Sequence, residues 1–248
     1  MEQQQQFPAE EVTLPSKGIL YSPESPLKDG ILEMKYMTAR EEDILTNQNL
    51  IANGTVIDKL LQSLIISKID YNELLIGDKD ALMVAARVLG YGSDYSFTYR
   101  GKEITVDLST LKDKPLSAEP IEEGKNEFEF TLPISKTKLT FKLLTHKDEN
   151  EMKKELDGLR KIDKNSNKEL STRLKYIILS VDGDYEKATI RNFVDNRFLA
   201  KEAREFRKYV NKIQPSVDLS FEYEDNEGDT AKVDIPVGLD FFWPDATI

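Results

Sequence analysis

Residues 37–92 place three helix starts in close succession, and this segment constrains the fold more than any other part of the chain. Thr38 and Glu41 have the spacing of a capping box, in which a hydroxyl and a carboxylate bind free amides at a helix start. Thr55 and Asp58 repeat this spacing, and Asp78 can cap a third helix. The sequence predicts a compact helical module with almost no linker. The expected helices cover residues 39–46, 55–67 and 78–89.

Cysteine is absent and histidine occurs once, which removes most of the usual catalytic and metal-binding side chains. We expect His146 to be a solvated residue before a helix, so neither a histidine metal site nor a Ser-His-Asp triad has support. Residues 163–167 begin like a calcium loop, but Lys168 and Leu174 stand where a glycine and a bidentate glutamate are required. There is no glycine-rich phosphate loop and no nucleophile elbow. We therefore expect a non-enzymatic protein with no metal and no cofactor.

Acidic residues outnumber basic ones by 45 to 34, which gives a formal charge of -11. A surface of this sign repels phosphate backbones, so we expect no nucleic-acid partner. No apolar run approaches the roughly 20 residues that a membrane-spanning helix needs, so we expect a soluble chain that contacts no membrane. The N-terminus is rich in glutamine and does not read as an export signal. Residues 1–11 are expected to form a disordered lead.

An extended arm follows this lead. Its apolar residues, Leu14 and Tyr21 among them, alternate with turn formers, and Pro23 and Pro26 forbid a helix. Two interpretations are open. The arm is either an ordinary N-terminal strand that closes the domain or a docking arm for a partner protein, in which case Leu14 and Tyr21 are candidate contacts.

The best candidate domain boundary lies in residues 109–126, which contain Pro115, Pro120 and a charged turn. We therefore expect a helical module with its arm and a hairpin over residues 12–115, followed by a second domain over residues 120–248. The hairpins are expected at residues 96–99 with 103–108, 128–134 with 139–144, and 217–223 with 231–235. Helices are expected at residues 152–162, 170–181 and 185–214. This order predicts an α+β fold in which hairpins bracket the helices of the second domain.

Two clusters in the second half are candidate partner contacts. The first is a basic cluster near the end of the helices, which would suit an acidic partner. It consists of Arg197, Lys201, Arg204, Arg207, Lys208 and Lys212. The alternative is a salt-bridged outer face, because Glu202 and Glu205 lie among the basic residues. The second is an apolar cluster near the C-terminus, which could anchor an interface or fold back onto the core. It consists of Phe241, Phe242 and Trp243.

Several motifs in the first half, taken together, resemble one known family. They are residues 14–18, 37–46, 54–60 and 77–87, with Gly-Tyr-Gly at 90–92. In their order and spacing they resemble the T-even-type bacteriophage baseplate protein family, which is associated with hub assembly in contractile tails. The resemblance covers roughly residues 14–108. Many members of that family carry a cysteine-based metal knuckle shortly after Gly-Tyr-Gly, whereas this chain has a hairpin without cysteine there.

The resemblance implies a structural component of a contractile tail baseplate that acts through contacts with other tail and baseplate proteins and is compatible with several copies per particle. The expected location is the virion, after assembly in the host cytoplasm. The alternative is a transient assembly chaperone that is not retained in the finished particle. Both functions depend on shape and contacts instead of chemistry.

Overall fold

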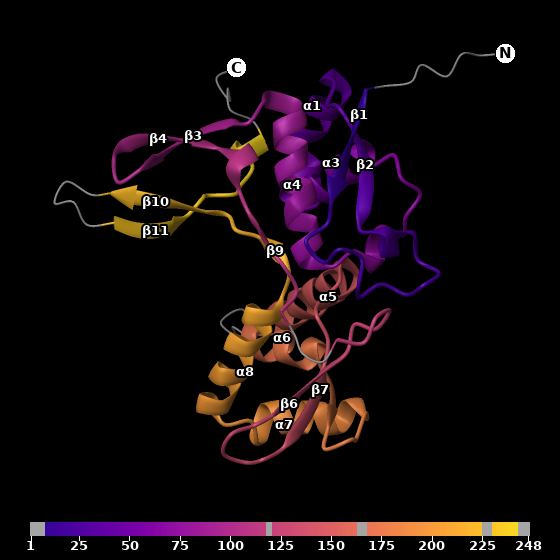
Figure 1. The fold of residues 1–248 in the computed structure, drawn as a ribbon. Helices are drawn as coiled ribbons and strands as arrows, with labels where there is room; N and C mark the ends of the chain where they lie inside the picture. Colours follow the sequence, from indigo (N-terminus) through magenta and orange to yellow (C-terminus); the bar gives the residue numbers. More distant parts are fainter. Residues whose placement is uncertain (1–7, 118–120, 163–167, 225–229, 243–248) are drawn as a thin grey trace.

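A computed structural model describes residues 8–117, 121–162, 168–224 and 230–242. The α+β class is confirmed: within these residues, eight α-helices are combined with small antiparallel sheets. Figure 1 shows two lobes that contact each other. The first lobe holds residues 8–110 together with residues 218–224 and 230–242, and the second lobe holds residues 121–162 and 168–213. No helix among the described residues has the length and apolar character needed to cross a membrane.

The first lobe contains the predicted helical module. Its helices are α1 (Ala39–Leu45), α2 (Gln48–Ala52), α3 (Val56–Leu64) and α4 (Ile76–Tyr91). The pairing of Thr38 with Glu41 is confirmed, because the Glu41 carboxylate accepts from the Thr38 N–H at 3.1 Å and from the Thr38 hydroxyl at 2.6 Å. Asp78 does not cap α4, which begins two residues earlier than Asp78.

The arm begins as an ordinary antiparallel strand. β1 (Ala9–Thr13) pairs with β2 (Ile31–Lys35) along its whole length. The boundary of the expected disordered lead was therefore wrong for residues 9–11, which belong to β1, while residues 1–7 lie outside the described part of the chain. Short 3-10 turns complete the elements of the first lobe. These are Pro26–Asp29, Tyr71–Glu73, Leu108–Thr110 and Asp240–Phe242.

Two of the predicted hairpins lie side by side in the first lobe (Figure 1). β3 (Asp94–Tyr99) pairs with β4 (Lys102–Asp107), and β10 (Ser220–Glu224) pairs with β11 (Thr230–Asp234). The first hairpin turns through Arg100 and Gly101, both with positive φ, as a two-residue turn of matching twist requires. Aromatic rings of the two hairpins pack against each other, although the hairpins are far apart in the sequence. The ring centroids of Phe97 and Phe221, for example, lie 5.3 Å apart.

The second lobe packs helices against a three-stranded sheet of order β6-β7-β8. Its strands are β6 (Phe128–Thr131), β7 (Lys138–Phe141) and β8 (Ile178–Val181), and its helices are α5 (His146–Ile162), α6 (Glu169–Ile177), α7 (Lys187–Asn196) and α8 (Ala200–Ile213). One expectation was wrong here. The helix predicted for residues 170–181 ends at Ile177, because the next four residues pair with β7 as β8.

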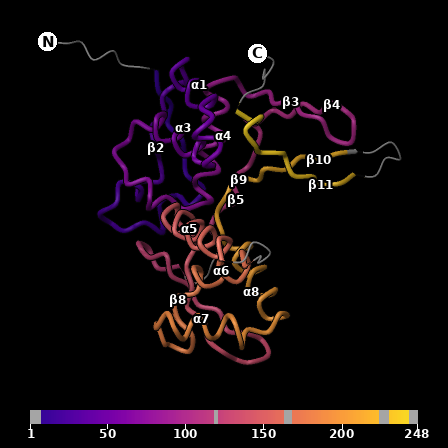
Figure 2. Tube along the Cα trace, turned by 180° about the vertical axis from the view of Figure 1, so that it is seen from behind, coloured from indigo at the N-terminus to yellow at the C-terminus, as the bar shows by residue number. Residues whose placement is uncertain are grey.

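After α8 the chain leaves the second lobe, within the stretch that was expected to form one domain over residues 120–248. β5 (Asp113–Lys114) pairs with β9 (Ser216–Val217), and Figure 2 shows this pair between the two lobes. Beyond β9 the chain returns to the first lobe, where the Phe241 ring packs 4.9 Å from the Tyr95 ring. The first lobe is therefore built from two separate stretches of sequence. The buried apolar residues of both lobes form one hydrophobic cluster.

Candidate functional site

The arm residues predicted as partner contacts are buried within the chain itself. Leu14 is 0% exposed and Tyr21 is 7% exposed, and both belong to the hydrophobic core. This corrects the docking-arm interpretation for these two residues and agrees with the alternative, a segment that closes its own domain. Leu14 presents no surface to a partner, and Tyr21 presents very little.

A buried carboxylate holds the arm in place. Asp78 on α4 accepts from the Ser16 N–H at 2.8 Å, from the Ser16 hydroxyl at 2.6 Å and from the Tyr21 hydroxyl at 2.6 Å. The Tyr21 oxygen in turn accepts from the Leu75 N–H at 2.9 Å. Burial raises the pKa of Asp78 although these hydrogen bonds oppose the change, and burial together with the Asp78 charge raises the pKa of Tyr21. We call Ser16, Tyr21 and Asp78 the arm clamp.

The C-terminal aromatic residues are likewise internal. Phe241 and Phe242 are buried, and Tyr95 donates from its hydroxyl to the Pro236 carbonyl at 3.0 Å beside them. The interface interpretation is therefore corrected for Phe241 and Phe242, which anchor the returning C-terminal segment on the first lobe. Trp243 lies outside the described residues, as do the calcium-like residues 163–167.

His146 is a buried residue at the junction of the lobes, which corrects its expected solvation. Its ring packs edge-on against Tyr71 at 4.6 Å, and its Nε2 lies 2.8 Å from the Asn150 amide nitrogen. The His146 Nδ1 lies 3.7 Å from Asp58, which the Lys79 ammonium binds at 2.7 Å. Burial lowers the pKa of His146, so the ring stays neutral near pH 7. The described residues contain no group of three or more histidine or acidic side chains placed to hold a metal ion.

The basic cluster on α8 is the predicted contact region that stays at the surface. Arg204 and Lys208 are exposed. Of the two acidic residues expected to neutralise this face, Glu205 pairs with Lys208 at 3.0 Å, but Glu202 is buried and points away from it. Glu202 accepts from two backbone N–H groups of the β6–β7 turn, which outweigh the cost of burial and lower its pKa. The salt-bridged interpretation therefore applies to the pair of Lys208 and Glu205, and Arg204 has no acidic partner among the described residues.

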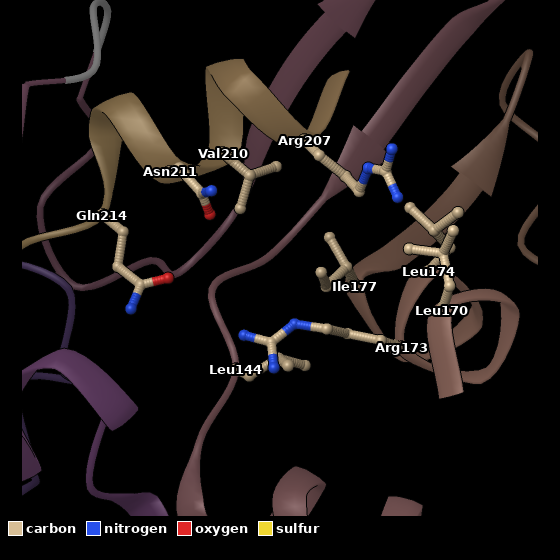
Figure 3. A pocket seen from close by; sticks show the side chains of 9 residues that line it. All are labelled: Leu144, Leu170, Arg173, Leu174, Ile177, Arg207, Val210, Asn211 and Gln214. Carbon is tan, nitrogen blue, oxygen red and sulfur yellow. The ribbon is translucent and has the colours of Figure 1, made fainter. Parts of the chain in front are cut away.

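A groove runs beside this face, between α6 and α8 (Figure 3). It has a volume of about 280 Å³. Each helix contributes residues at positions i, i+3, i+4 and i+7, which form one face of a helix. The lining residues are Leu170, Arg173, Leu174 and Ile177 of α6, Arg207, Val210, Asn211 and Gln214 at and just after α8, and Leu144. We call this the α6–α8 groove.

The α6–α8 groove carries charged side chains of one sign only, whereas a neighbouring pocket is lined by both acidic and basic residues. Among the described residues, neither Arg173 nor Arg207 has an acidic partner, and no acidic residue lines the groove. The neighbouring pocket, between α5, α6 and α7, contains Lys142 bound to Asp148 at 2.7 Å and Tyr176 bound to Glu155 at 3.2 Å. The α6–α8 groove is therefore the candidate site, and its chemistry is suited to binding anionic groups next to an apolar surface.

The sequence identified only half of this site. Arg207 belongs to the basic cluster noted on α8, whereas Arg173 and Leu170 were expected only as part of a helix over residues 170–181. Their helical spacing was readable, but which face of α6 meets α8 depends on the tertiary fold. Comparison of the chain with protein-family models, with curated proteins and with solved structures found no match in any of the three.

Proposed function

We propose that this chain is a structural or assembly component of a contractile bacteriophage tail baseplate and acts by binding neighbouring tail proteins, without catalysing a reaction. The observation that carries the proposal is the resemblance of residues 14–108 to the T-even-type baseplate protein family. It depends on the order and spacing of several motifs and not on any one of them.

The way in which these motifs meet supports the proposal. Ser16 in the first motif binds Asp78 in the last motif, although 62 residues separate them. Glu41 in the second motif accepts from the Ser63 hydroxyl of α3 at 2.7 Å and from Lys35 at 2.8 Å. The motifs thus contribute to one folded unit, as is expected if their order and spacing preserve a module.

Mass spectrometry of purified tail particles tests the proposal and separates it from its alternative. A structural component is expected in a fixed ratio to the other tail proteins. A transient assembly chaperone is expected to be absent from the particle, while removal of its gene stops tail assembly. If the protein is absent and tails still assemble without its gene, both forms of the proposal are wrong.

A further inference from the structure

We propose that the α6–α8 groove binds an acidic peptide segment of a partner protein, with an apolar side chain on the groove floor and carboxylates on Arg173 and Arg207. This inference goes beyond the tail proposal, because it depends only on the groove and applies whatever particle the chain belongs to.

The floor of the groove is apolar and already formed. Leu144, Leu174, Ile177 and Val210 belong to the core of the second lobe, and each leaves only its outer atoms at the groove. Leu170 stands at the rim with half of its surface exposed, at 50%. A volume of about 280 Å³ lies just below the range of about 300–1,000 Å³ that is usual for small-molecule pockets. It suits one or two side chains of a peptide that continues outside the groove.

The two arginines favour separate acidic groups over a single anion. Figure 3 shows the guanidinium groups at different ends of the groove, with Ile177 between them. A guanidinium binds a carboxylate through two parallel hydrogen bonds, so each arginine can take its own carboxylate. An anion such as phosphate would instead be held best by arginines that converge on one point.

Charge complementarity identifies the partner as acidic. The chain as a whole carries a charge of -11, yet this groove contains two cationic and no anionic side chains. Arg204 lies one helical turn before Arg207, so the positive surface continues beyond the groove along α8. The excess of acidic residues elsewhere disfavours a nucleic acid, and a nucleic acid would gain little from the apolar floor. An acidic segment with an apolar side chain matches both features of the groove.

Fluorescence anisotropy with the full chain tests this inference. The probe is a labelled synthetic peptide of about two heptads, with leucines at helical spacing and glutamates between them. Its matched control replaces every glutamate with glutamine. We expect the acidic peptide to bind the wild-type chain, and we expect Arg173→Glu and Arg207→Glu each to weaken binding at least about tenfold. Leu170→Asp, which places a carboxylate at the rim, is expected to weaken binding in the same direction.

Arg197→Glu is the matched control variant, because it makes the same charge change at an exposed residue that does not line the groove. It is expected to change affinity less than about twofold. Circular dichroism and urea unfolding establish that every variant is folded.

Four outcomes would overturn the inference. In the first, the acidic peptide does not bind at millimolar concentration, and in the second, the glutamine peptide binds as tightly as the acidic peptide. In the third, Arg197→Glu loses as much affinity as the groove variants. In the fourth, single-stranded DNA binds and its binding depends on the same arginines. If the chain self-associates and the groove variants abolish this self-association, the occupant of the groove is a second copy of the chain and not a partner protein. Because the assay uses the purified chain alone, its failure leaves the tail proposal unaffected, and absence from particles leaves this inference unaffected.

Discussion

The N-terminal arm was predicted as a partner contact and the α6–α8 groove is proposed as one, and the polar groups of these two regions are satisfied in opposite ways. In the arm, the hydroxyls of Ser16 and Tyr21 donate hydrogen bonds to Asp78, and the apolar side chains are buried in the core. In the groove, Arg173 and Arg207 have no acidic partner among the described residues. Buried polar groups are normally satisfied inside the molecule, so a satisfied segment has little left to offer a partner. We therefore place the proposed contact site at the unpaired charges beside apolar surface and not at the aromatic residue of the arm.

The largest expected effect is on the arm clamp. Asp78→Ala should lower the free energy of unfolding by about 3 kcal/mol, because it removes the acceptor of three hydrogen bonds and leaves the Ser16 N–H and the Ser16 and Tyr21 hydroxyls buried without an acceptor. Urea unfolding followed by circular dichroism measures this change. Asp78→Asn should cost less, because an amide oxygen can still accept from the Ser16 N–H.

The matched control is Asp43→Ala, which removes an exposed carboxylate from the first lobe. It is expected to change the free energy of unfolding by less than about 0.5 kcal/mol. If Asp78→Ala were as mild as this control, the arm would not depend on its clamp, and the contrast between a sealed arm and an open groove would fail.

The second prediction concerns the return of the chain to the first lobe. Gly77 lies in the first turn of α4, where an added Cβ would stand 1.7 Å from the Pro215 carbonyl oxygen. Gly77→Ala should therefore push β9 away from α4 and destabilise the protein by about 2 kcal/mol, measured by urea unfolding. Gly158→Ala is the control, because this exposed position of α5 has open space around the new atom. There, helix propensity should stabilise the protein by up to about 1 kcal/mol, and equal effects of the two changes would contradict the close approach.

The third prediction concerns Glu41, a second buried carboxylate whose hydrogen bonds are formed within the chain, and the dependence of its stabilising effect on pH. Burial opposes the charge of Glu41, but hydrogen bonds from Lys35, Thr38 and Ser63 outweigh it and lower the pKa of Glu41 to about 2, from an ordinary value of 4.5. A lowered pKa stabilises the fold above about pH 4.5, and this contribution is lost as the pH falls toward 2. At pH 7 the free energy of unfolding of the wild type should exceed that of Glu41→Gln by on the order of 2 kcal/mol. This difference should vanish near pH 2.

Urea unfolding at a series of pH values measures this difference. Glu33→Gln, a change at an exposed carboxylate of β2, serves as the control. A difference between wild type and Glu41→Gln that stayed constant with pH would show that Glu41 acts through packing and not through its charge.

Two sequence signals that act within a few residues identified their elements correctly, whereas Thr55 precedes α3 as expected but makes no side-chain capping hydrogen bond. The pairing of Thr38 with Glu41 and the Arg100–Gly101 turn are both set by neighbouring residues, and both were predictable. Signals that depend on distant partners failed. Asp78 looks like a helix cap in the sequence, but the carboxylate serves Ser16, 62 residues earlier. Residues 178–181 continue an apolar helical pattern, yet the free edge of β7 pairs with them.

For the candidate site, too, the sequence predicted the local features and missed those that depend on distant residues. The basic spacing along α8 is local and was noted, but the sequence could not show that Glu202 turns inward to the amides of Ile134 and Ser135. That one side chain decides whether the α8 face is neutralised or open. The pairing of α6 with α8 is also a long-range property, so Arg173 could not be connected with Arg207 before the fold was known.

The smallest expected effect completes the comparison. Arg173→Glu and Arg207→Glu should each change the free energy of unfolding by less than about 0.5 kcal/mol, because neither arginine has a carboxylate partner to lose in the described part of the chain. The same urea unfolding used for Asp78→Ala measures this, and the two kinds of variant should differ severalfold. A groove arginine whose reversal cost as much as loss of the clamp would have to hold the second lobe together. Stability and peptide binding would then be lost together, whereas a binding groove requires that the arginine variants lose binding and keep their stability.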